Sequence, residues 1–138
     1  MEKIIHESEF AIAKYDAEKE LYTLKYLPKT ADMRDEDWKD LMKQLLIVTD
    51  KYKPKYILDD NSERLFAYPP ELQEWTLKLF IGTWIKNGLK KYVQILPNDF
   101  IGGLSAEQIV ELANVKFSDI FENTFVSSSN EAIKWLGI

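Results

Sequence analysis

Residues 55–75, KYILDDNSERLFAYPPELQEW, pass from an apolar run through an acidic corner into a segment that begins with two prolines. The apolar residues 56–58 predict a short buried strand, and the polar residues 59–61 are expected to end it. Proline suits the first turn of a helix because it has no N–H to leave unpaired there, so a helix is expected from Pro70. The stretch therefore predicts a strand, a long loop and a helix.

Strand and helix patterns alternate along the rest of the chain. Residues 9–15 and 20–27 alternate apolar with polar side chains around a polar turn, which predicts a β-hairpin whose second strand stops at Pro28. Residues 32–52 repeat apolar side chains every three or four positions, which predicts an amphipathic helix capped by Asp32. The remaining predicted elements are helices that begin near residues 70, 105 and 128, and strands at residues 92–96 and 121–127.

These elements predict a single α/β domain over residues 1–138. A hairpin followed by strand–helix alternation favours a mixed β-sheet of about five strands, with the later strands parallel and four helices flanking the sheet. The length of 138 residues is ordinary for one domain, and 46% hydrophobic residues are enough for a core. Trp38, Trp84 and Trp135 fall on apolar helix faces, so we expect them in that core.

Composition argues against several classes of protein. The net charge of −5 disfavours nucleic acid as a partner, and Lys86, Lys90 and Lys91 flank a helix end where cations have a structural role. Cysteine is absent, which excludes disulfides and thiol chemistry. The start of the chain lacks the long apolar region of a secretory signal, and the apolar window 77–85 is too short to span a membrane. We expect a cytoplasmic protein without a membrane span.

Four segments occur in a characteristic order: the strand YILDDN, the helix PPELQEW, the strand KKYVQILP and the ending EAIKWLG. Together with the order of elements, they resemble the SpoIIAA-like or STAS-type domains, which are related to bacterial anti-sigma-factor antagonists. The resemblance covers most of the chain and implies a mixed sheet flanked by helices. It also implies a binding or regulatory module. Related branches of that superfamily include Sec14-like lipid-binding domains.

One feature of that family is missing from this sequence. Regulatory members carry a phosphorylatable serine or threonine where the helix after the central strand begins, but here residues 67–70 are AYPP. The nearest loop serine, Ser62, lies several residues earlier, and a phosphate there would face Asp59, Asp60 and Glu63. We therefore do not transfer the phosphorylation switch to this chain.

Two loops are candidates for a binding surface, because ligands of parallel α/β sheets usually meet the carboxyl ends of the strands. The loops are residues 61–69 and 98–104, and their apolar side chains exceed what a connection needs. The candidate binding residues are Phe66, Tyr68, Trp75, Phe100 and Ile101. The alternative is that these aromatic side chains fold back over the end of the sheet and complete the core.

Catalytic and metal sites find little support in the residue pattern. Asp59, Asp60 and Asp99 could meet at one end of the sheet and hold Mg²⁺ or Ca²⁺, but turn and cap roles suit these acids better. His6, the single histidine, is expected to be a solvated terminal residue. Residues 127–129, SSS, are expected to cap the last helix. No catalytic residue and no cofactor is therefore assigned.

The sequence thus predicts a non-enzymatic regulatory or protein-interaction module that uses the loops 61–69 and 98–104. The protein partner is unidentified. A domain that binds a small apolar ligand or lipid is the alternative, because aromatic side chains could line a pocket. A metal-dependent hydrolase is a third and weaker reading, and homodimerisation remains open.

Overall fold

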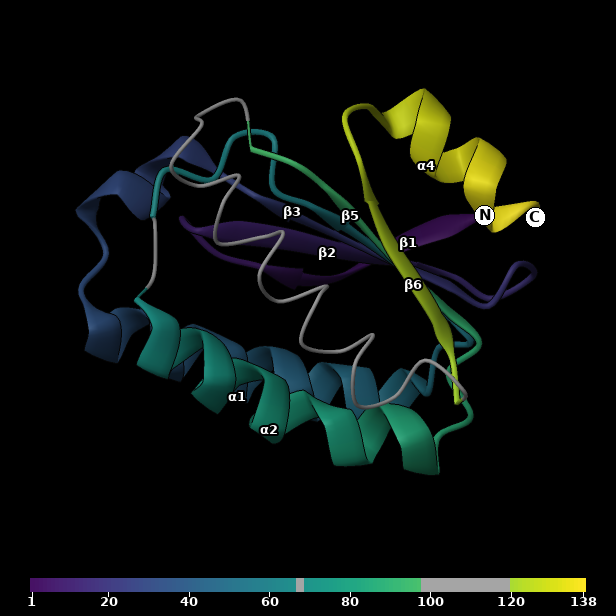
Figure 1. Ribbon diagram of the computed structural model, residues 1–138, viewed down its shortest axis with the longest axis horizontal. Helices are drawn as coiled ribbons and strands as arrows, with labels where there is room; N and C mark the ends of the chain where they lie inside the picture. Colours follow the sequence, from purple (N-terminus) through teal and green to yellow (C-terminus); the bar gives the residue numbers. More distant parts are fainter. Residues whose placement is uncertain (67–68, 98–119) are drawn as a thin grey trace.

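The computed structural model describes residues 1–66, 69–97 and 120–138, which form a sheet with helices on both faces (Figure 1). The strands are β1 (Glu2–Glu7), β2 (Ala11–Asp16), β3 (Leu21–Tyr26), β4 (Tyr56–Asp60), β5 (Lys91–Ile95) and β6 (Glu122–Val126). The helices are α1 (Asp35–Tyr52), α2 (Pro70–Lys86) and α4 (Ser129–Leu136), with a 3₁₀ helix, η1 (Pro28–Asp32), before α1.

The described strands make one mixed sheet in which strand order follows chain order, β1-β2-β3-β4-β5-β6. The pairs β1–β2 and β2–β3 are antiparallel. The pairs β3–β4, β4–β5 and β5–β6 are parallel, and Asp59 is level with Leu24 on one side and Gln94 on the other. The predicted class, an α/β fold with an N-terminal hairpin and later parallel strands, is confirmed.

One face of the sheet packs against α1 and α2, which lie side by side beneath it in Figure 1. The main hydrophobic core fills this layer, where Tyr22, Leu24 and Ile57 of the sheet meet Trp38 of α1 and Phe80 of α2. The indole N–H of Trp38 also donates to the Thr76 hydroxyl at 2.9 Å, which joins the two helices. Burial of aromatic side chains on this scale is the main favourable contribution to folding.

The opposite face carries α4, which lies over β4, β5 and β6 (Figure 1). Leu58, Val93 and Ile95 of the sheet pack there against Ala132 and Leu136. Successive strand residues point to opposite faces, so Ile57 belongs to the first layer and Leu58 to the second. Trp38 and Trp84 are buried as predicted, and Trp135 is half-buried against the second layer.

The sheet has one more strand than predicted, because residues 2–7 form the edge strand β1. Its side chains are exposed or half-buried, so its sequence carries no alternation that would reveal a strand. His6 lies in this strand and is half-buried, which corrects its reading as a solvated terminal residue. Burial lowers the pKa of its imidazole.

Three of the four predicted α-helices are present in the described residues, and the bounds of two of them are shifted. The helix expected from Asp32 begins at Asp35, where the Asp37 carboxylate accepts from the Arg34 N–H at 2.9 Å, while Asp32 pairs with Lys29 at 2.8 Å. Three α-helices lie in the described part of the chain. The helix predicted near residue 105 falls outside the described residues. None of the described helices combines the length and the hydrophobicity needed to cross a bilayer.

Candidate functional site

The loop that follows β4 is held by hydrogen bonds to its own residues and to two neighbouring segments. The Asn61 N–H donates to the Ile95 carbonyl of β5 at 3.1 Å, and the Leu65 N–H donates to the Thr30 hydroxyl of η1 at 2.9 Å. The Ser62 N–H donates to the Asp60 carboxylate at 2.9 Å. These bonds fix the loop at the carboxyl end of the sheet, where parallel α/β sheets usually bind ligands.

A buried arginine organises the same loop from inside. Arg64 is only 1% exposed, its Nε donates to Asn61 Oδ1 at 2.7 Å, and a terminal guanidinium nitrogen donates to the Phe66 carbonyl. Asn61 is itself 3% exposed and donates to the Asp59 carbonyl at 3.1 Å. Leu65, by contrast, is 50% exposed between these anchored residues. Among its described residues, the loop thus presents the Leu65 side chain to solvent on a hydrogen-bonded support.

The predicted binding residues divide between described and undescribed parts of the chain. Phe66 is half-buried and stacks on Trp38, with ring centroids 5.3 Å apart and planes 24° from parallel. Trp75 is half-buried against the same core and lies under the Lys39 ammonium, 5.3 Å from the ring centroid. Tyr68, Phe100 and Ile101 fall outside the described residues. For Phe66, the contact with Trp38 favours the reading as part of the core.

The acidic corner is arranged differently from the prediction, because β4 continues through Asp59 and Asp60 instead of ending before them. Asp59 points into the layer between the sheet and helices α1 and α2, whereas Asp60 borders a groove beside α4 on the opposite face. Asp60 and Asn61 serve the loop as expected, but Asp59 does not. The two carboxylates face away from each other, and no group of three or more metal-ligating side chains occurs in the described part of the chain.

Asp59 belongs to a buried chain of polar side chains across two strands. The Tyr92 hydroxyl donates to Asp59 Oδ2 at 2.5 Å, and the Gln94 amide donates to the Tyr92 hydroxyl at 2.9 Å. All three residues are less than 10% exposed. Burial raises the pKa of Asp59 from 3.8 to about 6, while the bond from Tyr92 and the charge of Arg64 act in the opposite direction. The Tyr92 pKa is raised well above 10.0, first by burial and then by the Asp59 charge.

This polar chain borders a cavity of about 50 Å³ between the sheet and the two helices. Its lining includes the aromatic rings of Tyr22, Tyr26, Trp38, Phe80, Trp84 and Tyr92. Within the described ranges, four buried atoms of its lining residues have no hydrogen-bond partner, namely Asp59 Oδ1, Gln94 Oε1, Trp84 Nε1 and the Tyr22 hydroxyl. Unpartnered buried polar atoms are rare in folded proteins, so four around one cavity mark it as a candidate site.

Sequence reasoning did not find this cavity, although part of the signal was present. Asp59 follows Ile57 by two positions, and Gln94 follows Tyr92 by two, so each polar residue shares a strand face with a core residue. The missing information was the register that places Asp59 opposite Gln94.

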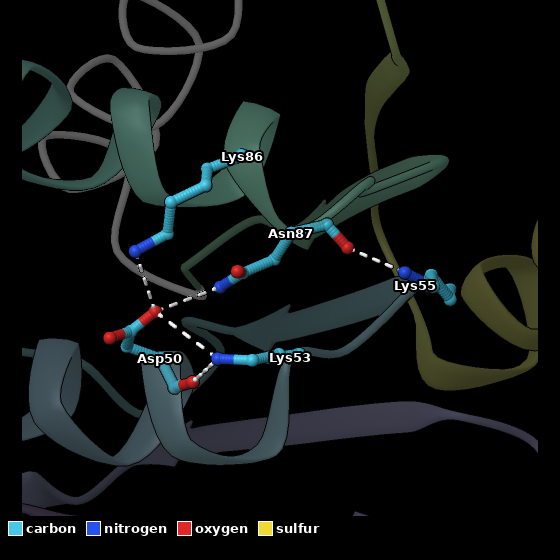
Figure 2. Close-up of polar contacts among 5 residues, drawn as sticks. All are labelled: Asp50, Lys53, Lys55, Lys86 and Asn87. Carbon is cyan, nitrogen blue, oxygen red and sulfur yellow. Dashed lines mark hydrogen bonds and ion pairs between the residues drawn. The ribbon is translucent and has the colours of Figure 1, made fainter.

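The lysine-rich helix end at residues 86–91 has a structural role, as predicted. The Asp50 carboxylate of α1 accepts a hydrogen bond from the Asn87 side chain at 3.2 Å (Figure 2). The same carboxylate forms ion pairs with Lys86 at 3.3 Å and with Lys53 at 3.7 Å. Lys55 donates to the Asn87 carbonyl at 2.5 Å. These contacts join the C-terminal ends of α1 and α2.

Two side chains cap the ends of α4, and one of them, Lys91, was predicted to serve the end of α2 instead. Lys91 donates to the carbonyls of Trp135 and Leu136, at 3.1 and 3.2 Å, and so caps the end of this helix. Ser128 accepts from the Glu131 N–H at 3.3 Å and caps the start, which confirms the predicted capping serine.

Comparison with known proteins leaves the site to be read from its geometry. The chain matches no family model, no curated protein and no solved structure.

Proposed function

We propose that the chain is a non-enzymatic regulatory or protein-interaction module of the SpoIIAA-like type, and that its protein partner docks on the loop after β4. The observation that carries the proposal is the exposed Leu65, held between the buried Arg64 and the stacked Phe66. The loop 98–104, with Phe100 and Ile101, is the proposed second part of the surface.

Preorganisation of the loop after β4 supports this proposal. Binding costs less free energy when the contacting segment is already ordered, because little conformational entropy remains to be lost. The bonds from Asn61 to β5 and from Leu65 to Thr30 fix this loop before any partner arrives. An apolar side chain on an ordered support is the kind of anchor on which protein interfaces depend.

Leu65→Asp is the sharpest test of this surface. Phe66 is less suitable, because its contact with Trp38 makes any substitution a test of folding. The matched control is Ile47→Asp, since Ile47 is 72% exposed in the C-terminal half of α1. Both variants should retain the circular dichroism and the unfolding midpoint of the wild type.

The three proteins are used in affinity capture from host lysate, with bound proteins compared by quantitative mass spectrometry. We expect a protein that wild type and Ile47→Asp retain equally and that Leu65→Asp loses by tenfold or more, a factor that corresponds to about 1.4 kcal/mol. If every captured protein is retained equally by Leu65→Asp, the loop is not the docking surface.

The geometry gives less support to the other two candidate functions. Small-molecule sites usually have volumes of about 300–1,000 Å³, and the cavity beside Asp59 measures about 50 Å³, which is too small for an acyl chain. A metal-dependent hydrolase would need converging carboxylates, but Asp59 and Asp60 lie on opposite faces of the sheet.

A further inference from the structure

The hydrogen-bonding needs of the cavity beside Asp59 define the chemistry of a partner. The Tyr92 hydroxyl donates its single hydrogen to Asp59 Oδ2 and accepts a hydrogen bond from the Gln94 side-chain amide. This leaves Asp59 Oδ1 and Gln94 Oε1 without a donor from the described residues. Both atoms are acceptors when the carboxyl is ionised, so their partner must bring at least two N–H or O–H groups.

The charge of the cavity favours a cation. Asp59 supplies a negative charge, and no lysine, arginine or histidine of the described ranges lines the cavity. Arg64 lies close enough to lower the Asp59 pKa, but it donates to Asn61 and Phe66. The cavity is also lined by the aromatic rings of Trp38, Phe80 and Trp84, and the faces of such rings attract an organic cation electrostatically.

The size of the cavity limits the ligand. A water molecule needs about 10–15 Å³ of such space, so about 50 Å³ accommodates three or four non-hydrogen atoms. Trp84 Nε1 is a donor without a partner among the described residues, and it would suit a hydroxyl oxygen on the ligand.

We propose that the cavity between the sheet and helices α1 and α2 binds a small primary ammonium ion, whose N–H groups donate to Asp59 Oδ1 and Gln94 Oε1. The best fit is an amino alcohol of about four non-hydrogen atoms, because its hydroxyl can accept from Trp84. This site is separate from the surface proposed to bind a protein, because Leu65 does not line the cavity.

Binding of ethanolammonium chloride tests the proposal, with sodium chloride at equal ionic strength as the salt control. Ethylene glycol is the neutral control, because it has the same number of non-hydrogen atoms and no charge. At pH 7.5 we expect saturable binding of ethanolammonium with a Kd between about 0.1 and 10 mM, the range open to so small a ligand. The indole N–H resonance of Trp84, assigned with Trp84→Phe, should shift on binding, and ethylene glycol should bind at least tenfold more weakly.

Two variants locate the site. Asp59→Asn should weaken ethanolammonium binding tenfold or more, and Gln94→Leu should weaken it less because the carboxylate remains. Should Asp59→Asn fail to fold, the wild type at pH 5.0 replaces it, since protonation of Asp59 removes the charge and must weaken binding about tenfold.

Three results would overturn the proposal. They are the absence of saturable binding to the wild type, equal binding of ethylene glycol, and binding that neither Asp59→Asn nor the shift to pH 5.0 weakens. Equal binding of ethylene glycol would mean that the cavity has no preference for a cation, and either of the other two results would mean that Asp59 holds no ammonium ion.

Discussion

The Tyr92 hydroxyl on β5 donates a 2.5 Å hydrogen bond to Asp59 Oδ2 on β4, inside the apolar layer between the sheet and the helices. This bond crosses two adjacent parallel strands, and each of its residues is buried. A carboxyl group in such a position is costly to ionise, which makes it a source of pH dependence.

The first prediction concerns the stability of the wild type as a function of pH. Burial raises the pKa of Asp59 to about 6 in the folded state, against an ordinary value of 3.8. The titratable groups that interact with it are Tyr22, Tyr92, Arg64 and Asp60. Between these two pKa values, Asp59 holds a proton in the folded state that it has lost in the unfolded state. Its contribution to the free energy of unfolding therefore falls as the pH rises from about 4 to about 6. The loss is about 3 kcal/mol. Urea unfolding of the wild type and Asp59→Asn at pH 4 and 7 measures it, and equal pH dependence in both would contradict it.

Tyr92→Phe removes the donor to Asp59 and the acceptor of Gln94 in one step. We expect a loss of about 1–3 kcal/mol in the free energy of unfolding at pH 7, because two buried polar groups lose their partner. The Asp59 pKa should rise further, which carboxyl NMR can follow. Tyr56→Phe is the matched control, since Tyr56 is half-buried on the other face of β4. An equal loss in both variants would mean that the hydroxyl of Tyr92 adds nothing specific.

The chain has two arginines, which provide a matched pair for testing the loop after β4. Arg64→Gln should cost about 3 kcal/mol or more, because Arg64 is buried and bonds to Asn61 and to the Phe66 carbonyl. Arg34→Gln should leave the free energy of unfolding close to that of the wild type, because its ion pair with Asp37 is exposed. Hydrogen exchange of the Leu65 amide, which bonds to Thr30, should accelerate only in Arg64→Gln. Unchanged exchange there would show that the loop is ordered without the arginine.

Asp50 connects the ends of α1 and α2, as Figure 2 shows, and its bond from Asn87 and its contact with Lys86 lower the pKa of its carboxyl. Its stabilising contribution is therefore present at neutral pH and is lost as the pH falls through this lowered value. Asp50→Asn should lower the unfolding temperature at pH 7 and at low salt, with a smaller effect at high salt. Asp40 is exposed on the same helix, and Asp40→Asn should leave the unfolding temperature unchanged at low and at high salt. A drop that persists undiminished at high salt would point to a lost hydrogen bond instead of an ionic contact.

Local signals account for what the sequence predicted correctly. The start of α4 follows from Ser128 and Glu131, and its end from Gly137, whose φ of 70° favours glycine. Likewise, α1 shows its period and its acidic first turn, and Pro54 lies beyond its end. These features depend on residues a few positions apart, so they can be read without knowing the fold.

Features that depend on distant residues were missed or left open. In the sequence, Asp59 looks like the polar end of a strand. Its partners Tyr92 and Gln94 lie on β5, and Tyr92 is 33 positions further along the chain. The exposure of Phe66 could not be decided either, because Trp38 and Phe66 approach through the packing of α1 against the loop. The edge strand β1 buries so little that no burial pattern marks it.

The agreement of strand order with chain order has a consequence for how the sheet is assembled. Each strand joins the outer side of the strand before it, so no later strand has to insert between two that are already paired. The sheet can therefore extend in one direction, from the β1–β2–β3 meander towards β6, as more of the chain becomes available. The parallel pairs join residues more than 30 positions apart, such as Leu21 and Tyr56, so we expect them to form after the local meander.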